Sequence, residues 1–410
     1  MAMSRYGRKI AVEELRAGMY VEALDRPWTE TDFAFQGMRV DTADEIERLR
    51  ALCRHVYVSP ATLDEPTQPG AEDARRSTFR GAYAGRESSS DNAIRERTPR
   101  GFREELPRAR MLREQARDLI TTVHADIESG RTVDVRGARE VVAEMIDSVA
   151  RHPDALLWFT QLKNRDAYTA LHSLNVCMLS ITLASALDLD EADVQEMGVG
   201  ALLRDVGKIR IPLAILNKPG RLTDEEFALM RRHPEYGVDM LRDSPDLTPA
   251  SLEIVLSHHE RLDGSGYPNG LAGAQLSTYT QIVAIADVYD AVTSDRVYQK
   301  GRTPAEALTL MHGTDDREFN GRMLRVFEQT MGVHPPGSVV ELNTGEVGLI
   351  LPDSVGADEP VVLIVLDHRK RRYYPQRVRD LSRFPSFRIA RVLQPGTYDI
   401  DVDDYAEEMH

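Results

Sequence analysis

Residues 258–268 of this 410-residue chain read His258-His259-Glu260-Arg261-Leu262-Asp263-Gly264-Ser265-Gly266-Tyr267-Pro268. The two adjacent imidazoles end a segment of helical apolar periodicity, in which His259 shares a stripe with Leu252, Val255 and Leu256. The residues after them are turn formers, so we expect a loop with glycines at positive φ that is either purely structural or borders a site. Taken alone, the histidine pair is as compatible with hydrogen-bonded core residues as with metal ligands.

Asp205 lies on the apolar face of an earlier helical segment. Val194, Met197, Ala201 and Asp205 follow the spacing i, i+3, i+7 and i+11, which places the carboxylate on the buried side. Burying an unpaired carboxylate is costly, so Asp205 needs a cation, hydrogen-bond donors or a metal ion beside it. A helix cap or a salt-bridge partner would also explain this residue taken alone.

Other histidines and aspartates of the same region repeat this pattern. His172 lies on an apolar helical stripe, and Asp287 and Asp290 are spaced i, i+3 on a later helix. The candidates, which come from separate segments, are His172, Asp205, His233, His258, His259 and Asp287. Imidazole with carboxylate suits Mn, Fe, Ni or Zn better than Ca, and two bridged ions can activate water and clamp a phosphodiester. The prediction of a metal site depends on the set, because His172 alone is better explained as a core histidine.

Composition and periodicity divide the chain into four parts. Residues 8–60 predict a small α+β module, and residues 61–104, rich in Pro, Gly, Ser and charge, predict a flexible linker. Helical periodicity fills residues 105–335, and strand patterns return over residues 336–400. The helical part contains two capping sequences, Thr223 to Glu226 and Thr303-Pro304-Ala305-Glu306. We therefore expect a mainly α protein, a helical bundle with a small α+β N-terminal module and a small β-rich C-terminal module.

Charge and cysteine content narrow the possible functions. The chain has 51 Lys and Arg against 66 Asp and Glu, a formal net charge of −15, which argues against binding a nucleic-acid polymer through its phosphates. Only Cys53 and Cys177 are present, which excludes a disulfide framework and a cysteine zinc site. No apolar run is long enough to span a bilayer and no signal peptide is visible, so we expect a cytoplasmic protein that does not bind membranes.

Three stretches resemble the signature of one family. The pattern HD-x-GK-x-x-x-P is similar to Arg204-Asp205-Val206-Gly207-Lys208-Ile209-Arg210-Ile211-Pro212, and HHE-x-x-DG-x-GYP is similar to residues 258–268. The segment that follows in the family is similar to Ile285-Ala286-Asp287-Val288-Tyr289-Asp290-Ala291 with Ser294-Asp295-Arg296. About residues 150–335 therefore resemble the HD-GYP branch of the HD metal-dependent phosphohydrolases. Residues 17–28 are similar to an uncharacterised module often found before such domains.

The resemblance implies hydrolysis of cyclic di-GMP, to a linear dinucleotide or GMP, at a centre of one or two divalent transition-metal ions, Fe, Mn or Ni. The implied metal ligands are His172, Asp205, His233, His258, His259 and Asp287. Asp205, as the bridge between ions, and Lys208 would act in catalysis, and Lys208 and Arg296 would hold phosphate. Tyr267 would border the substrate, and its loop is a candidate docking site for a GGDEF synthase domain. Family members with a third metal have a Glu where Tyr168 stands, so no third ion is implied.

Arg204 departs from the family pattern, which has a ligand histidine at this position. Arginine keeps its proton in a protein and offers no lone pair, so one ion loses a ligand and gains a positive neighbour. One possible outcome is a slower enzyme in which Arg204 contacts substrate and mimics the missing cation. A second is a non-catalytic signalling protein that still binds cyclic di-GMP or a partner. Unchanged activity, or hydrolysis of another phosphoester, are the remaining alternatives.

Overall fold

The structure, a computed structural model, describes most of the chain. The described residues are 8–16, 19–24, 38–40, 43–58, 100–161, 168–218, 220–294, 301–313, 318–352, 360–394, 396–400, 402 and 404–405. The chain forms two compact units, Met1–Gly85 and Arg86–His410. Most of the predicted linker lies outside the described residues, as does Arg296.

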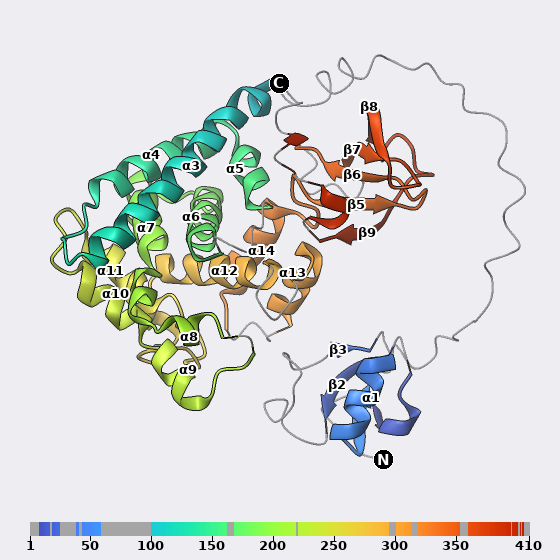
Figure 1. The fold of residues 1–410 in the computed structure, drawn as a ribbon, viewed down its shortest axis with the longest axis horizontal. Coiled ribbons are helices and arrows are strands. Elements are labelled where there is room, and N and C mark those ends of the chain that lie inside the picture. Colours follow the sequence, from blue (N-terminus) through green and yellow to red (C-terminus); the bar gives the residue numbers. More distant parts are fainter. Residues whose placement is uncertain are drawn as a thin grey trace, which may run out of the picture. The chain divides into compact units, whose positions relative to one another are not determined.

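In the N-terminal unit, a helix lies beside an antiparallel sheet, as expected for a small α+β module (Figure 1). Its elements are β1 (Arg8–Ala11), η1 (Val12–Glu14), β2 (Tyr20–Leu24), β3 (Met38–Arg39), α1 (Ala43–Leu52) and β4 (His55–Val58). The strand order is β1-β4-β2-β3, and Ile10 is paired with Val56. Alternation along β4 buries Val56 and Val58 against Leu49 of α1, so the module has a hydrophobic core of its own.

The second unit begins with the helical bundle. Its helices are α3 (Arg100–Glu128), α4 (Arg136–Arg151), α5 (Pro153–Thr160), α6 (Tyr168–Ala186), α7 (Glu191–Leu203), η4 (Val206–Arg210), α8 (Leu213–Leu216), α9 (Asp224–Met230), α10 (His233–Leu241), α11 (Pro249–Ser257), η5 (Gly273–Gln275), α12 (Thr278–Thr293), α13 (Pro304–His312) and α14 (Gly321–Met331). The predicted start at residue 105 is wrong, because α3 begins at Arg100. The residue that indicates this earlier start is Phe102, which is fully buried and continues the apolar stripe of α3 toward its N-terminus.

Both predicted capping sequences begin helices in the structure. Thr223 caps α9, with its side chain accepting from the Glu226 amide and the Glu226 carboxylate accepting in return. The same reciprocal pair joins Thr303 to Glu306 at the start of α13, where Pro304 occupies the first turn. Each cap satisfies backbone donors that have no partner inside the helix.

Three helices form the centre of the bundle, α6, α7 and α12, and α6 packs against both of the others. Their buried residues surround each helix rather than one face, which is typical of helices enclosed by other helices. In this apolar environment the polar side chains of His172 and Asp287 are also buried. Among the described residues, no helix has the length and apolar character needed to cross a membrane.

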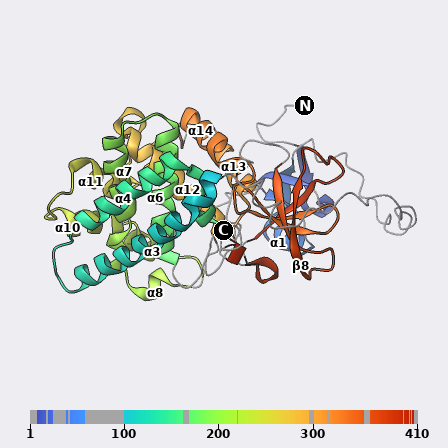
Figure 2. The ribbon, with the colours of Figure 1, turned by 90° about the horizontal axis from the view of Figure 1, so that it is seen from above.

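The C-terminal module is an antiparallel sheet of β5 (Val339–Leu342), β6 (Val347–Ile350), β7 (Val361–Leu366), β8 (Arg372–Asp380) and β9 (Ile389–Leu393), followed by η6 (Thr397–Asp399). The strand order is β8-β7-β6-β5-β9. In both views the sheet lies at one end of the bundle, next to α13 (Figures 1 and 2). One sheet face shares its core with the helices through residues such as Leu349 and Leu363. The prediction of a mainly α fold with a small β-rich C-terminal module is therefore confirmed.

Gly207 brings two site-bearing segments together. A Cβ atom on Gly207 would lie 1.9 Å from the His233 carbonyl oxygen and 2.5 Å from the Gly237 amide nitrogen. Only glycine therefore lets η4 lie against the first turn of α10. This contact places Asp205, two residues before Gly207, beside the His233 side chain.

Gly207→Ala is expected to lower the stability of the helical unit by about 3 kcal/mol or more, because the clash is with backbone that cannot rotate away. Metal affinity should fall as well, since Asp205 and His233 are pushed apart. Gly313→Ala is the matched control, because its Cβ would meet its nearest atom at 3.3 Å. Thermal unfolding of both variants measures the difference. Equal unfolding temperatures would contradict the role given to Gly207.

Candidate metal centre

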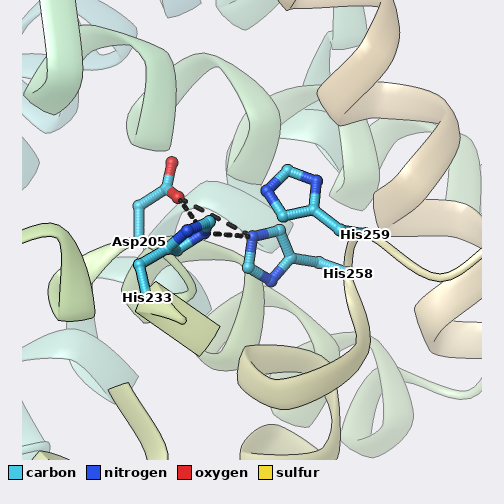
Figure 3. A group of neighbouring side chains, drawn as sticks. All are labelled: Asp205, His233, His258 and His259. Carbon is cyan, nitrogen blue, oxygen red and sulfur yellow. Dashed lines mark hydrogen bonds and ion pairs between the residues drawn. The ribbon is translucent and has the colours of Figure 1, made fainter. Parts of the chain in front are cut away.

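Four of the predicted ligands meet at one point, where three helix ends converge (Figure 3). Asp205 follows α7 and begins η4, and His233 is the first residue of α10. His258 and His259 directly follow α11. One ligand atom from each of the four lies within 4.8 Å of the others. The sequence prediction that separate segments bring these residues together thus agrees with the geometry.

Hydrogen bonds fix the tautomers of two of these histidines. His233 Nδ1 lies 2.8 Å from the Met230 carbonyl oxygen, and His258 Nδ1 lies 3.0 Å from the Val255 carbonyl oxygen. A carbonyl only accepts, so each neutral ring carries its proton on Nδ1 and has a lone pair on Nε2. The two Nε2 atoms face each other at 3.3 Å. Two lone pairs at this distance repel unless a cation lies between them, so the arrangement fits a divalent metal ion.

Asp205 supplies the negative charge of this group. Its Oδ1 lies 3.4 Å from His233 Nε2 and 3.7 Å from His258 Nε2. Neither carboxylate oxygen accepts a hydrogen bond of good geometry from the described residues, although both are buried. Burial by itself raises the pKa of Asp205, but the charges of Lys208 and Arg204 outweigh it and hold this pKa well below its ordinary value. A buried carboxylate that stays ionised and has unused lone pairs is what a metal ligand requires.

Two histidines of this group, His233 and His259, are kept neutral by burial. Desolvation lowers the pKa of His233 and lowers that of His259 well below its ordinary value, and the nearby His258 adds to the effect at His259. Neutral imidazoles can bind a metal ion without first losing a proton. His259 Nδ1 lies 3.8 Å from Asp287 Oδ2, which connects this group to the second one.

The second group contains His172, Asp205 and Asp287. His172 Nε2 lies 3.1 Å from Asp287 Oδ1 and 4.0 Å from Asp205 Oδ2. On the other side of the ring, His172 Nδ1 lies 2.7 Å from Asp290 Oδ2. Asp290 also accepts from the Asn175 side chain at 2.9 Å. Asp290 therefore orients His172, as a carboxylate behind a ligand histidine commonly does.

The Arg204 guanidinium lies inside the second group, with no exposed surface. Its Nε donates to Asp287 Oδ1 at 3.0 Å, and its NH1 donates to the Ala201 carbonyl oxygen at 3.0 Å. Its NH2 lies 2.9 Å from Asp287 Oδ1 and 3.3 Å from Asp205 Oδ2. These are the same two oxygens that face His172. The guanidinium thus takes the position that a second cation would take.

Electrostatics keep Arg204 charged at this place. Burial lowers the pKa of the guanidinium, but the Asp205 and Asp287 carboxylates outweigh this and raise it. The same interaction holds the pKa of Asp287 well below its ordinary value against the effect of burial. The three residues form a buried network in which two negative charges share one permanent positive charge.

Lys208 and Tyr267 border the first group. Lys208 Nζ lies 2.8 Å from Asp205 Oδ1, and its side chain is 19% exposed, so it reaches both the buried carboxylate and the surface. The Tyr267 ring lies 4.6 Å from the His259 ring, centroid to centroid, at 30°. Burial, with the Asp287 and Asp205 charges, raises the pKa of Tyr267, so the phenol stays protonated.

Glu260 holds the loop that carries Tyr267. The carboxylate is fully buried and accepts from the Asn269 amide at 2.7 Å and the Leu271 amide at 3.0 Å. Gly266 lies against the same segment, because a Cβ there would come 2.4 Å from Glu260 Cα. The loop is therefore tied to the residue that follows the two histidines, and Tyr267 is held over His259.

Sequence reasoning missed three residues of this region. It noted the spacing of Asp290 but gave it no role, and it omitted Asn175, which lies one helical turn after His172. It also omitted His124, the lone histidine of α3. Burial lowers the pKa of His124, and the charge of Asp205 opposes this with a smaller effect, which places the two side chains near each other. Nothing in the local pattern marks His124, because only the packing of α3 against η4 brings it near.

Comparison with known proteins finds two matching families and several similar phosphodiesterases. The HD domain family matches residues 145–323, and the family described as domain of unknown function (DUF3391) matches residues 7–138. The chain is 36% identical to cyclic di-GMP phosphodiesterase PA4108 of Pseudomonas aeruginosa, over 92% of this chain and 89% of the relative. It is 30% identical to the cyclic di-GMP phosphodiesterase response regulator RpfG of Xanthomonas campestris pv. campestris, over 71% and 72% of the two chains. It is also 34% identical to 3'3'-cGAMP-specific phosphodiesterase 2 of Vibrio cholerae, over 46% and 34%.

The helical fold and the cluster of histidines and aspartates define an HD-domain protein with a site suited to metal. Within that class, the chain belongs to the HD-GYP family. The match to the domain of unknown function extends from the N-terminal α+β module into α3 and α4, beyond the predicted boundary of that module at residue 60.

Proposed function

We propose that this chain hydrolyses a phosphodiester bond of cyclic di-GMP, to a linear dinucleotide or GMP, at a centre with one divalent transition-metal ion. The observation that carries the proposal is the convergence of Asp205, His233, His258 and His259 within 4.8 Å, with both Nε2 lone pairs directed at one point. Two relatives that match most of the chain are named cyclic di-GMP phosphodiesterases. Three imidazoles and one carboxylate suit Fe, Mn or Ni.

Four residues have specific roles in this proposal. The bound ion would supply Lewis acidity and an activated water. Asp205 directs negative charge at the ion, and Lys208, partly exposed beside Asp205, holds a phosphate oxygen as a point charge. Tyr267 forms a wall beside His259. Arg296 stays a prediction for phosphate binding, since it lies outside the described residues.

Arg204 takes the place of a second ion in this proposal. His172, Asp205 and Asp287 could otherwise hold that ion, but the guanidinium already pairs with both carboxylates and offsets one of their two negative charges. A guanidinium is a fixed cation but cannot activate a water as a metal does. We therefore propose a slower enzyme than a relative with two ions.

The same observation favours an alternative, a protein that binds cyclic di-GMP without hydrolysing it. In that case the fixed Arg204 cation stabilises the folded site. Binding of cyclic di-GMP then acts as a signal that is passed to the rest of the protein. The exposed Asn269 and Gly270 at the tip of the Tyr267 loop are then the natural docking position for a GGDEF domain. Cytoplasmic location is part of the proposal, since the buried thiols of Cys53 and Cys177 suit a reducing compartment.

Metal removal tests the function directly. We expect purified protein to contain about one transition-metal ion per chain and to convert cyclic di-GMP to a linear product. Treatment with a chelator should abolish product formation, and adding back Mn²⁺ or Fe²⁺ should restore it. Elemental analysis and chromatography of the products measure both effects. Binding of cyclic di-GMP without any product would support the alternative, and absence of binding would exclude both functions.

A further inference from the structure

A row of stacked groups leads from the candidate metal ligands to the surface. The Tyr267 ring lies over His259, and the Arg231 guanidinium carbon lies 4.8 Å from the Tyr267 ring centroid. The same guanidinium carbon lies 5.8 Å from the ring centroid of Phe227. Phe227 is 48% exposed, although it is a large aromatic residue. The two rings thus hold a planar cation next to the site and leave an aromatic surface open.

Arg231 differs from the arginines around it. Arg232 lies 3.6 Å from Glu235, and Arg210 lies 3.7 Å from Asp239. Within the described ranges, by contrast, no carboxylate forms an ion pair with Arg231, which is exposed at the end of α9. Its N–H groups are therefore available to a planar acceptor, and contact with the two rings restricts the plane in which they point.

We propose that Arg231 recognises a guanine base of the substrate, which deepens the proposed function and rests on it. The phosphodiester belongs beside Asp205 and Lys208, while Arg231 is separated from His259 by the Tyr267 ring. Because the Tyr267 ring lies between Arg231 and the candidate metal ligand His259, the position of Arg231 suits the base of a dinucleotide rather than its scissile phosphate. Guanine presents O6 and N7 as adjacent acceptors that an arginine fork can meet together. Adenine presents an amino donor in place of O6, so the fork discriminates against it. The open face of Phe227 offers a stacking surface for the same base.

Two variants of Arg231 test this assignment in the full chain. Arg231→Lys keeps the charge and removes the fork, and Arg231→Ala removes both. With a chelator present to prevent turnover, calorimetry measures the affinities for cyclic di-GMP and cyclic di-AMP. We expect the preference for cyclic di-GMP to fall by about tenfold to a hundredfold in both variants. Arg232→Lys is the matched control, because Arg232 lies over Tyr236 and not over Tyr267, and it should keep the preference.

The outcomes separate this inference from the proposed function. Equal losses of affinity for both dinucleotides would assign Arg231 to phosphate and overturn guanine recognition. An unchanged preference with a lower unfolding temperature would reduce Arg231 to a structural partner of Phe227 and also overturn it. If the wild-type protein binds and hydrolyses cyclic di-GMP, neither of these two results contradicts the proposed function. Wild-type protein that binds metal but no cyclic di-GMP would remove both.

Discussion

Arg204→His is expected to raise the transition-metal content from about one ion per chain to about two, and to increase cyclic di-GMP turnover on the order of a hundredfold or more. Arg204 NH2 now lies within 3.3 Å of both Asp205 Oδ2 and Asp287 Oδ1. Histidine removes that fixed cation and supplies a ligand nitrogen, so a second ion can neutralise the two carboxylates. Elemental analysis of Mn²⁺-loaded protein and the rate of product formation measure the two effects.

Stability gives a second readout of the same substitution. In chelated Arg204→His protein, Asp287 remains buried without its main positive partner, a loss that costs about 3–5 kcal/mol for a broken buried pair, while Asp205 keeps Lys208. Divalent metal should bind the assembled ligands of the folded protein more tightly than the unfolded chain, so its addition should recover much of this loss. Wild-type protein should respond less to metal, because Arg204 already pairs with both carboxylates of the second group.

Arg204→Gln is the matched control, since it removes the cation without supplying an imidazole. We expect this variant to be less stable than wild type and to show no gain in turnover. The role given to Arg204 would be contradicted by two ions per wild-type chain. It would also be contradicted by equally high rates of cyclic di-GMP turnover in wild type and Arg204→His. No turnover in either protein, with cyclic di-GMP still bound, would favour the non-catalytic alternative.

The sequence predicted those parts of the site that local patterns encode. The i, i+3, i+7, i+11 spacing placed Asp205 on a buried face, and the structure buries it. The capping sequences located the starts of α9 and α13. Arginine chemistry alone indicated that position 204 could not bind a metal. Each of these conclusions needs only a few neighbouring residues.

The remaining features depend on contacts between distant segments. Spacing could not show that the Arg204 guanidinium would point at Asp205 and Asp287 rather than leave the site, because Asp287 is far away in sequence. The Glu260 hydrogen bonds to Asn269 and Leu271 likewise exist only once the loop has closed. The start of α3 was misplaced because the compositional change at the linker is gradual, whereas Phe102 becomes buried only through tertiary packing.

Asp205→Asn is expected to lower turnover on the order of a thousandfold or more and to weaken metal binding by more than tenfold. Asparagine keeps the size of the side chain but removes the charge that faces every cation in the site. Lys208 Nζ at 2.8 Å and Arg204 NH2 at 3.3 Å would lose their shared partner. The His233 and His258 lone pairs would remain, so a weakly bound ion is expected rather than none.

Asp239→Asn is the matched control, because Asp239 is an exposed carboxylate that pairs only with surface arginines among the described residues. It should change turnover by less than about twofold, as exposed ion pairs contribute little. Thermal unfolding shows whether Asp205→Asn protein is folded, and metal titration then measures the affinity. Folded Asp205→Asn protein with wild-type turnover would mean that the reacting phosphodiester does not bind at the junction of α7, α10 and α11. Among the described residues, Asp205 belongs to both candidate groups, so its substitution tests the two halves of the proposed centre at once.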